Sequence, residues 1–330
     1  MKGEMILLVK ERTKPLILLI LEALLRRIPV SHKKYQSILE EVKRRQAGYL
    51  GEQSMDYYYR ELPDQKYKIL HDLNLPDGDY NCQIDTLLVT QEFALAIDVK
   101  NIAGKLIFDT ENEQFIQINN GIEKGYPYPI AQAERHQKYI QKLFAKHHFP
   151  AVPVEYLVVI SNGYTSYVVT GKNAYKVKSK VCKADVFLNK IKLLETQYSK
   201  PLLSTKELRK FCRLLLKMNT LPTNYVLQKY GIQKSDLSTG VHCPTSPDHS
   251  LIRKKQNWYC PICNTFSKDA HIEALKDYFL LIDTTITNKQ FREFAHLQSS
   301  DTAKRILQSC NLQYIGKNRF RCYTPKSFPW

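Results

Sequence analysis

The feature that most constrains the fold of this chain is a pair of neighbouring apolar runs, each interrupted by an aspartate. Residues 82–90 and 93–100 flank a short polar break at residues 91–92, a pattern that predicts a β-hairpin. Gln-Glu is a poor two-residue turn, and the loop can open symmetrically to four residues. Both loop lengths give the same register, because the end of the first run faces the start of the second. That register places Asp85 opposite Asp98.

The charged residues of this hairpin gather on one face. Side chains alternate between the two faces of a strand, so Asp98 and Lys100 share a face, and Asp85 lies across from Asp98. Directly opposed like charges destabilise a strand pair, unless one carboxyl group is protonated, a cation bridges the two, or the register differs. A divalent cation between two carboxylates, with a lysine beside it, fits phosphoryl chemistry. The alternative is an edge hairpin with one solvated face.

Asp85 followed by Asp98-Val99-Lys100 resembles the PD-(D/E)xK nuclease motif. Four segments in order resemble the NERD (nuclease-related) domain more closely, over roughly residues 44–164. These segments are Gly51-Glu52, Gln83-Ile84-Asp85-Thr86, Ile97-Asp98-Val99-Lys100-Asn101 and Pro129-Ile130-Ala131-Gln132.

The resemblance implies a fold class and a set of site residues. The fold it implies is α/β, with a restriction-endonuclease-like mixed sheet flanked by helices. Carried over position by position, Glu52, Asp85 and Asp98 would hold Mg²⁺ (or Mn²⁺). Lys100 would assist the attacking water, and Gln132 would line the site. NERD proteins usually have Glu at the position of Asp98, whereas the wider nuclease motif accepts either residue.

Two helices are predicted independently of that resemblance. Residues 35–62 carry apolar residues at helical spacing, and a second helix is predicted over residues 131–144. Gly48 and Gly51 lie inside the first of these segments, and a glycine within a helix costs about 0.5–1 kcal/mol relative to alanine. Close approach of another backbone or of a ligand, next to Glu52, would account for that cost.

The charge of the chain is distributed unevenly. The net charge of +17 arises in residues 171–330, which hold 28 basic and 11 acidic residues, whereas residues 1–170 hold 21 of each. A neutral half with clustered acids joined to a strongly basic half predicts a nucleic-acid partner, with DNA expected. The alternatives for the basic half are a membrane surface or a role in solubility alone.

Five parts are expected along the chain from these features. They are an amphipathic helical segment (1–40), the NERD nuclease-like core (41–170), a basic helical connector (171–240), a zinc-ribbon-like module (241–267) and a winged helix-turn-helix-like module (268–330).

No membrane partner is expected. The apolar stretch at residues 15–29 is too short for a membrane span and contains Glu22, Arg26 and Arg27. It predicts an amphipathic helix that packs on the core. Mixed charge before it, with no small-residue cleavage site after it, argues against a secretory signal. We therefore expect a reducing, cytoplasmic location.

A cysteine cluster resembles a zinc ribbon with one degraded knuckle. Cys260-Pro261-Ile262-Cys263 is a Cys-x₂-Cys knuckle, and Cys243-Pro244 begins what looks like its partner. The fourth ligand would fall at Ser246, a poor zinc ligand, so an imidazole of His249 or His242 could replace it. The residues expected to bind one structural Zn²⁺ are Cys243, His249, Cys260 and Cys263. The alternative is a ribbon that has lost its metal.

Beyond the cysteines, three helices and a basic hairpin are predicted. Residues 268–282 form the first helix, Thr287-Asn288 and Ser299-Ser300 can cap two further helices, and residues 312–323 alternate as a hairpin. This order suggests a winged helix-turn-helix. The nucleic-acid-binding residues expected on its recognition helix and wing are Lys304, Arg305, Lys317, Arg319 and Arg321. The alternative is a small helical cap with solvated charges.

These features together predict a metal-dependent nuclease that hydrolyses phosphodiester bonds of DNA, with a basic C-terminal half that binds the nucleic acid. A non-catalytic DNA-binding protein that retains a nuclease fold, and an RNA nuclease, are the alternatives.

Overall fold

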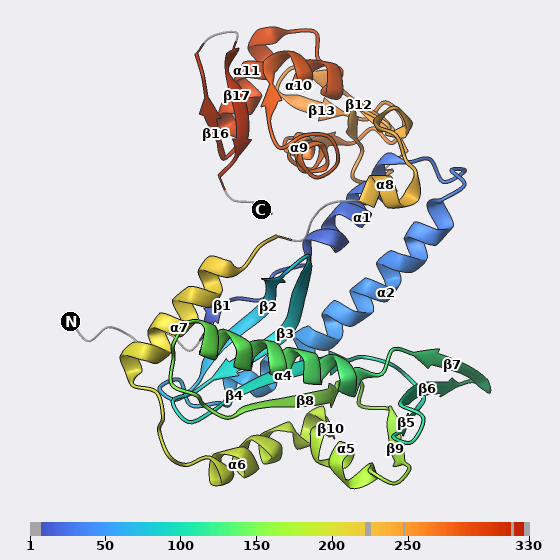
Figure 1. Ribbon diagram of the computed structural model, residues 1–330. Coiled ribbons are helices and arrows are strands. Elements are labelled where there is room, and N and C mark those ends of the chain that lie inside the picture. Colours follow the sequence, from blue (N-terminus) through green and yellow to red (C-terminus); the bar gives the residue numbers. More distant parts are fainter. Residues whose placement is uncertain (1–7, 222–225, 247, 318–319, 327–330) are drawn as a thin grey trace. The chain divides into compact units, whose positions relative to one another are not determined.

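The computed structural model describes residues 8–221, 226–246, 248–317 and 320–326 (Figure 1). The chain divides into two compact units, each built from two segments. The first unit comprises Met1–Lys14 and Gln46–Pro222, and the second comprises Pro15–Arg45 and Thr223–Trp330. The boundary at residue 45 falls inside helix α2 (Tyr35–Ser54). None of the described helices is long and apolar enough to cross a membrane.

A six-stranded mixed sheet forms the centre of the first unit. Its strands, in spatial order, are β1 (Leu8–Lys10), β2 (Lys68–Asp77), β3 (Tyr80–Val89), β4 (Ala94–Lys100), β8 (Val154–Ile160) and β10 (Val181–Lys183). The β2–β3 and β3–β4 pairs are antiparallel, whereas the β1–β2, β4–β8 and β8–β10 pairs are parallel.

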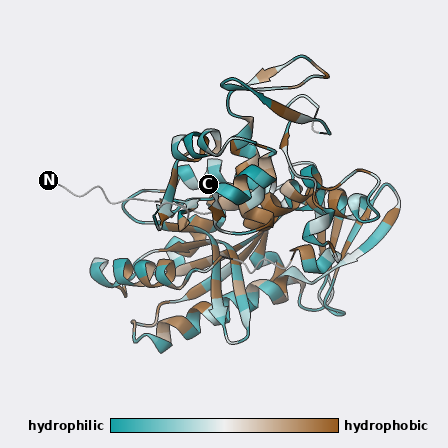
Figure 2. Cartoon of the chain, turned by 90° about the horizontal axis from the view of Figure 1, so that it is seen from above, coloured by the Kyte–Doolittle hydropathy of each residue, from teal (hydrophilic) through white to brown (hydrophobic). Residues whose placement is uncertain are grey.

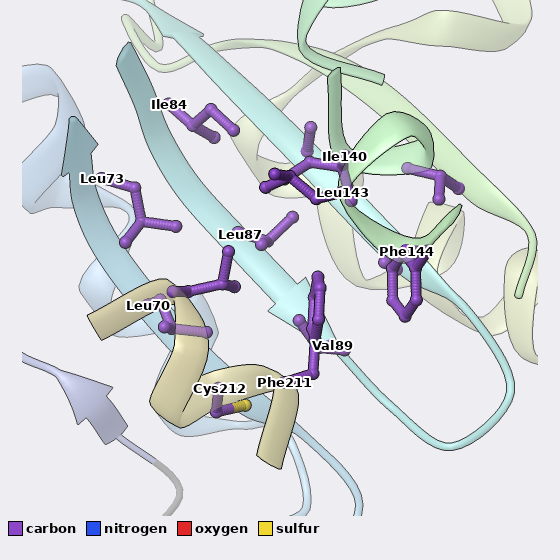
Figure 3. Close-up of a cluster of buried hydrophobic side chains, with 14 of the residues drawn as sticks. Leu70, Leu73, Ile84, Leu87, Val89, Ile140, Leu143, Phe144, Phe211 and Cys212 are labelled. Carbon is purple, nitrogen blue, oxygen red and sulfur yellow. The ribbon is translucent and has the colours of Figure 1, made fainter. Parts of the chain in front are cut away.

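Helices cover both faces of this sheet. On one face, α4 (Pro129–Lys146) and α7 (Thr205–Met218) pack Phe144 and Phe211 against strand residues that include Leu87 (Figure 3). On the other face, α3 (Asp56–Arg60) and α6 (Phe187–Gln197) pack against β3 and β4. Because β4 is covered on both faces, its sequence is almost continuously apolar. The predicted mixed sheet flanked by helices is confirmed.

The hydropathy of the residues varies with their place in these layers. Hydrophobic residues gather on the central strands, whereas the helices alternate between hydrophobic and hydrophilic residues (Figure 2). The α7 helix is a clear case, because Phe211 and Leu215 are buried on the sheet while Arg213 and Lys217 are exposed. Each such helix therefore buries one side and leaves a charged side for solvent or a partner.

A second, four-stranded sheet extends the first unit. It consists of β7 (Ile122–Tyr126), β6 (Gln114–Asn119), β5 (Lys105–Asp109) and β9 (Ser166–Thr170), in that spatial order. The short helix α5 (Ala174–Lys180) contacts β9 and β10 and so links the two sheets.

The predicted hairpin register is confirmed. Thr86 pairs with Ile97, and Val89 pairs with Ala94. The loop has four residues, and the Thr90 hydroxyl oxygen accepts the backbone N–H groups of Glu92 and Phe93 at 3.0 Å each. This side-chain cap explains how the loop closes without a glycine.

The second unit includes the N-terminal helix α1 (Leu16–Arg27). The predicted helix is present, and its packing partner is α9 (Ala270–Leu281) of the second unit. Arg27 is 2% exposed, and its Nε lies 2.7 Å from Oδ2 of the equally buried Asp277. Removing one partner of a buried pair leaves the other charge buried and unpaired. The stability of this unit therefore depends on a contact between residues 250 positions apart.

Two small modules complete the second unit, together with the short helix α8 (Val226–Tyr230). The strands of the first module are β11 (Val241–His242), β12 (Ser250–Lys254), β13 (Asn257–Tyr259) and β14 (Phe266–Ser267). The second module begins with α9 and continues with β15 (Ile286–Thr287), α10 (Asn288–Ala295), α11 (Ser300–Ser309), β16 (Leu312–Ile315) and β17 (Cys322–Pro325). Its sheet order is β15-β17-β16, which gives a winged-helix-like module. The predicted caps Thr287 and Ser299 are confirmed.

One glycine in α2 has no room for a side chain. A Cβ atom at Gly51 would lie 2.3 Å from the Cβ of Asn101 and 2.8 Å from the hydroxyl of Ser161. The close approach expected beside Glu52 is therefore confirmed for Gly51. At Gly48, by contrast, a Cβ would meet nothing within 4 Å.

This difference predicts opposite effects of the same substitution. Gly51→Ala should lower the free energy of unfolding by about 1–3 kcal/mol, because α2 must move away from β4. Gly48→Ala is the matched control and should raise it by about 0.5–1 kcal/mol, because alanine favours the helix. Urea denaturation measures both values, and a stabilised Gly51→Ala variant would contradict the close approach.

Candidate functional site

Asp98 and Lys100 lie two residues apart at the end of β4 and point to the same face. Asp98 is 1% exposed, and the Lys100 Nζ lies 3.0 Å from its Oδ1 and 2.8 Å from its Oδ2. The same Nζ lies 3.3 Å from Oε1 of Gln132, which α4 supplies from its first turn after Pro129. The structure thus brings together three of the residues predicted from the sequence.

Asp85 forms a hydrogen bond with the backbone of the next strand, β4. Its Oδ2 accepts the N–H of Val99 at 2.8 Å, one position beyond the last β3–β4 pair, Thr86–Ile97. This hydrogen bond holds a carboxylate beside Asp98 without requiring the two side chains to touch. Burial raises the pKa of Asp98 to about 7, with Lys100 opposing the shift and Asp85 adding to it.

One oxygen of Asp98 has an ion-pair contact but no hydrogen bond of good geometry among the described residues. Its Oδ2 is buried and has no hydrogen bond of good geometry within the described parts of the chain, although the Lys100 Nζ is close. A buried carboxylate oxygen without a full partner is costly, and a hard cation is the natural ligand for it. The donor set at Asp98 therefore fits a divalent metal.

Glu52 is held differently from the other two acids. It follows Gly51 on α2, and its Oε2 lies 2.8 Å from NH1 of Arg12. Burial, followed by the carboxylates of Asp85 and Asp72, raises the pKa of Glu52 to about 9. Among the described residues, the oxygens of Glu52, Asp85 and Asp98 do not form a group within 4.8 Å of one another. The three acids therefore interact electrostatically, but their oxygens are not arranged as a complete set of metal ligands.

Arg12 is the site residue that sequence reasoning missed. Its side chain is 4% exposed and lies 3.2 Å from Asp56 and 3.7 Å from Asp72, in addition to Glu52. It also contacts the His71 Nδ1 at 2.9 Å. Nothing in the sequence marks it, because Arg12 precedes the motif region and reaches the site through the pairing of β1 with β2.

Asp72 is a second acid that the sequence did not single out. Its backbone is left-handed, with φ of 50°, and the β2–β3 pairing is interrupted there between His71–Thr86 and Leu73–Ile84. The register is the same on both sides of this interruption, so Asp72 falls opposite Asp85. Burial raises the pKa of Asp72, and Arg12 opposes that shift.

Three cysteines of the second unit form a metal-binding group. The sulfur atoms of Cys243, Cys260 and Cys263 all lie within 4.8 Å of one another, so this trio could hold a metal ion. Burial alone would raise the pKa of the Cys243 thiol, but backbone hydrogen bonds from Thr245 and Ser246 outweigh it and lower the pKa to about 6. The first knuckle therefore stabilises a thiolate despite having Ser246 in its last position.

The fourth ligand of this group stays a prediction. His249 is not part of the trio's group, although its Nδ1 is buried and has no hydrogen-bond partner among the described residues. His242 turns away, with its Nε2 3.2 Å from NH1 of Arg27. The Thr265 hydroxyl, which sequence reasoning missed, lies 3.0 Å from the sulfur of Cys263.

The five predicted nucleic-acid-binding residues are only partly gathered. Lys304 on α11 and Arg321 before β17 line one cavity. Arg305 and Lys317 are exposed and do not line it, and Arg319 lies outside the described residues.

Residues 47–161 match the family model described as Nuclease-related domain. Glu52, Asp85, Asp98, Lys100 and Gln132 all lie inside the matched residues. This segment is a nuclease-related domain. Neither the curated proteins nor the solved structures compared with the chain contain a match.

The extent of the match agrees with the predicted resemblance over roughly residues 44–164. The nuclease-related domain takes up about a third of the 330-residue chain. It includes β2–β8 and α4, but it excludes Arg12 and the basic helices α6 and α7. These parts of the first unit lie outside the matched residues.

The cysteine group predicts one zinc ion per chain. Elemental analysis of the full chain, purified without chelator, should give a ratio near one, and Cys260→Ser should abolish it. His249→Ala should speed loss of zinc to a chelator, whereas His242→Ala is the control and should not, because its ring contacts Arg27. A zinc content near zero, with three freely reactive thiols, would mean that the ribbon has no metal.

Proposed function

We propose that this protein is a divalent-metal-dependent nuclease that hydrolyses phosphodiester bonds of DNA. The observation that carries the proposal is the buried Asp98 carboxylate, whose Oδ2 has no hydrogen bond of good geometry within the described parts of the chain and lies 2.8 Å from the ammonium group of Lys100. Within a nuclease-related domain, that arrangement fits metal-assisted attack of water on a phosphodiester.

Each residue of the site has a role in this reaction. Asp98 and Asp85, with Glu52 nearby, would hold Mg²⁺ or Mn²⁺. When bound, this ion supplies charge to the phosphate and lowers the pKa of a water. Lys100 orients the attacking water and offsets negative charge as it develops on the phosphate. Gln132 fixes the position of the Lys100 ammonium through its Oε1.

A basic track on α4 supports binding of the substrate backbone to the first unit. Four exposed cations follow Gln132 at spacings of three and four residues, on one side of the helix: Arg135, Lys138, Lys142 and Lys146. This spacing repeats about every 5 Å along the helix axis. The track therefore starts one turn from the catalytic lysine and leads away from it. Phosphate contacts of this kind fix position rather than sequence.

The α7 helix adds to the same cationic surface. It packs beside α4 on one face of the sheet (Figure 3), and its exposed basic residues are Lys206, Arg209, Lys210, Arg213 and Lys217. Residues 171–222 together hold 13 basic and 3 acidic residues and belong to the first unit. The predicted basic connector thus contributes most of its charge to the nuclease unit itself.

The second unit also carries an excess of positive charge. It holds 22 basic and 11 acidic residues, and its winged-helix-like module presents several of them. This excess supports a second region of contact with nucleic acid, with affinity that falls as salt rises. None of the eight cysteines forms a disulfide, which supports the proposal of a reducing, cytoplasmic location.

A non-catalytic nucleic-acid-binding protein is the second candidate. The observation that favours it is the Arg12–Glu52 ion pair, because an arginine occupies the ligand oxygen that a metal would use. The aspartate at position 98, where NERD proteins usually have glutamate, also favours a non-catalytic protein. RNA is the alternative substrate, since the catalytic groups contact only a phosphate.

The proposed function predicts Mg²⁺-dependent cleavage of DNA that EDTA abolishes. Asp85→Asn and Lys100→Met should each lower the rate by about 10²- to 10⁴-fold while leaving DNA affinity nearly unchanged. Lys172→Met, at an exposed lysine on the same unit, is the control and should cleave like the wild type. A fluorescent-substrate assay on duplex DNA, single-stranded DNA and RNA measures all four proteins.

The outcomes separate the candidates. Unchanged cleavage by Asp85→Asn or Lys100→Met would remove the catalytic assignment. Binding without cleavage by the wild type would favour the non-catalytic protein, and cleavage of RNA alone would identify an RNA nuclease.

A further inference from the structure

The winged-helix-like module contains a cavity of about 510 Å³. It lies among α10, α11 and β17, and four cationic side chains from the two helices and from the residue before β17 line it. They are Lys289, Arg292, Lys304 and Arg321. Cavities of this volume are in the range that holds a nucleotide-sized ligand.

The lining contains no carboxylate among the described residues. Lys289 has an acidic neighbour, Glu293, at 3.8 Å, but both side chains are largely exposed, so the pair is weak. Lys304 has no ion pair within the described parts of the chain. Four positive charges that converge on one concave space without internal neutralisation favour an anionic ligand.

Hydrogen bonds between α10 and α11 fix the shape of the cavity. Asn288 Oδ1 accepts Nε of Arg292 and the hydroxyl of Ser300, both at 3.2 Å. Its Nδ2 donates to the Ser300 carbonyl oxygen at 3.0 Å. The Arg292 guanidinium and the start of α11 are therefore held in place before any ligand arrives, which lowers the ordering cost of binding.

Arg321 provides a second, independent indication of a ligand. Its guanidinium carbon lies 4.3 Å from the centre of the Tyr314 ring, which keeps the side chain folded over β16. Its Nε is buried and has no hydrogen-bond partner among the described residues. A phosphate oxygen would satisfy this donor, because guanidinium groups match phosphate geometry.

We propose that this cavity binds a phosphomonoester, the terminal phosphate of a nucleic-acid strand. A phosphomonoester carries close to two negative charges and projects from the end of a chain, so it suits a concave group of four cations. A backbone phosphodiester carries one charge and continues on both sides, which suits the open track on α4. The inference rests on the proposed function, because a nuclease acts on strands that have such ends. A free nucleotide presents the same group.

The test compares two strands that differ only in the terminal phosphate. The full-length Lys100→Met protein, without added Mg²⁺ and without a chelator so that cleavage is suppressed and the cysteine group keeps its metal, is titrated into the same oligonucleotide with a 5′-phosphate, a 3′-phosphate or only hydroxyl ends, labelled internally for anisotropy. We expect one phosphorylated form to bind about tenfold more tightly than the hydroxyl form. With Lys304→Ala or Arg321→Ala added to this protein, that preference should fall to about threefold or less.

Arg305→Ala is the matched control. Arg305 neighbours Lys304 on α11 and is also exposed, so Arg305→Ala removes the same charge from the same helix. Arg305 does not line the cavity, which makes it the control. This variant should bind all strands more weakly and keep the preference. Because Lys304 is exposed, its substitution should leave folding intact, which circular dichroism checks.

Each possible outcome either supports or overturns the proposal. A phosphate preference that persists in Lys304→Ala and Arg321→Ala, or no preference in the Lys100→Met protein with its cavity intact, overturns the proposal. Competition by a nucleoside monophosphate that is as tight as the phosphorylated strand supports the cavity and identifies a free nucleotide as its ligand. Because binding is measured without cleavage, a protein that fails to cut DNA can still pass this test, and an active nuclease can fail it.

Discussion

The burial of Asp98 in the central strand β4 is the constraint on which the rest of the first unit depends. A carboxylate that is 1% exposed must be hydrogen-bonded or paired, and Lys100 on the same face supplies part of that pairing. Gln132 in turn fixes Lys100, so the start of α4 is tied to the end of β4. The hairpin register, the position of α4 and the chemistry of the site follow from the same buried group.

Arg12 makes the acidic side of the site stable in the absence of a cation. Glu52, Asp56 and Asp72 would repel one another in a partly buried space, and one guanidinium group, 4% exposed, pairs with all three. Gly51 lets α2 approach β4 closely enough to bring Glu52 into this group. Arg12, which follows β1 and lies outside the matched residues 47–161, thus supplies the positive charge that these three acids share.

Local patterns predicted much of this structure, and long-range contacts account for what they missed. The hairpin register follows from period-two alternation, and the caps Thr287 and Ser299 follow from residue type. The convergence of the three cysteines follows from their spacing. By contrast, nothing local indicates that Arg27 pairs with Asp277, so the assignment of residues 15–45 to the second unit was not predictable. The ion pairs of Arg12 were missed for the same reason.

The most direct test of the account is a crystal of the full-length protein soaked in Mn²⁺. We expect an anomalous peak within about 2.2 Å of Asp98 Oδ2, because this buried oxygen has no hydrogen bond of good geometry among the described residues and has only the Lys100 ammonium group beside it. Asp85 should contribute to the same ion, and the peak should be absent in Asp98→Asn. A fully occupied Mn²⁺ elsewhere in the unit, with Asp98 still bound only to Lys100, would contradict metal binding by Asp98.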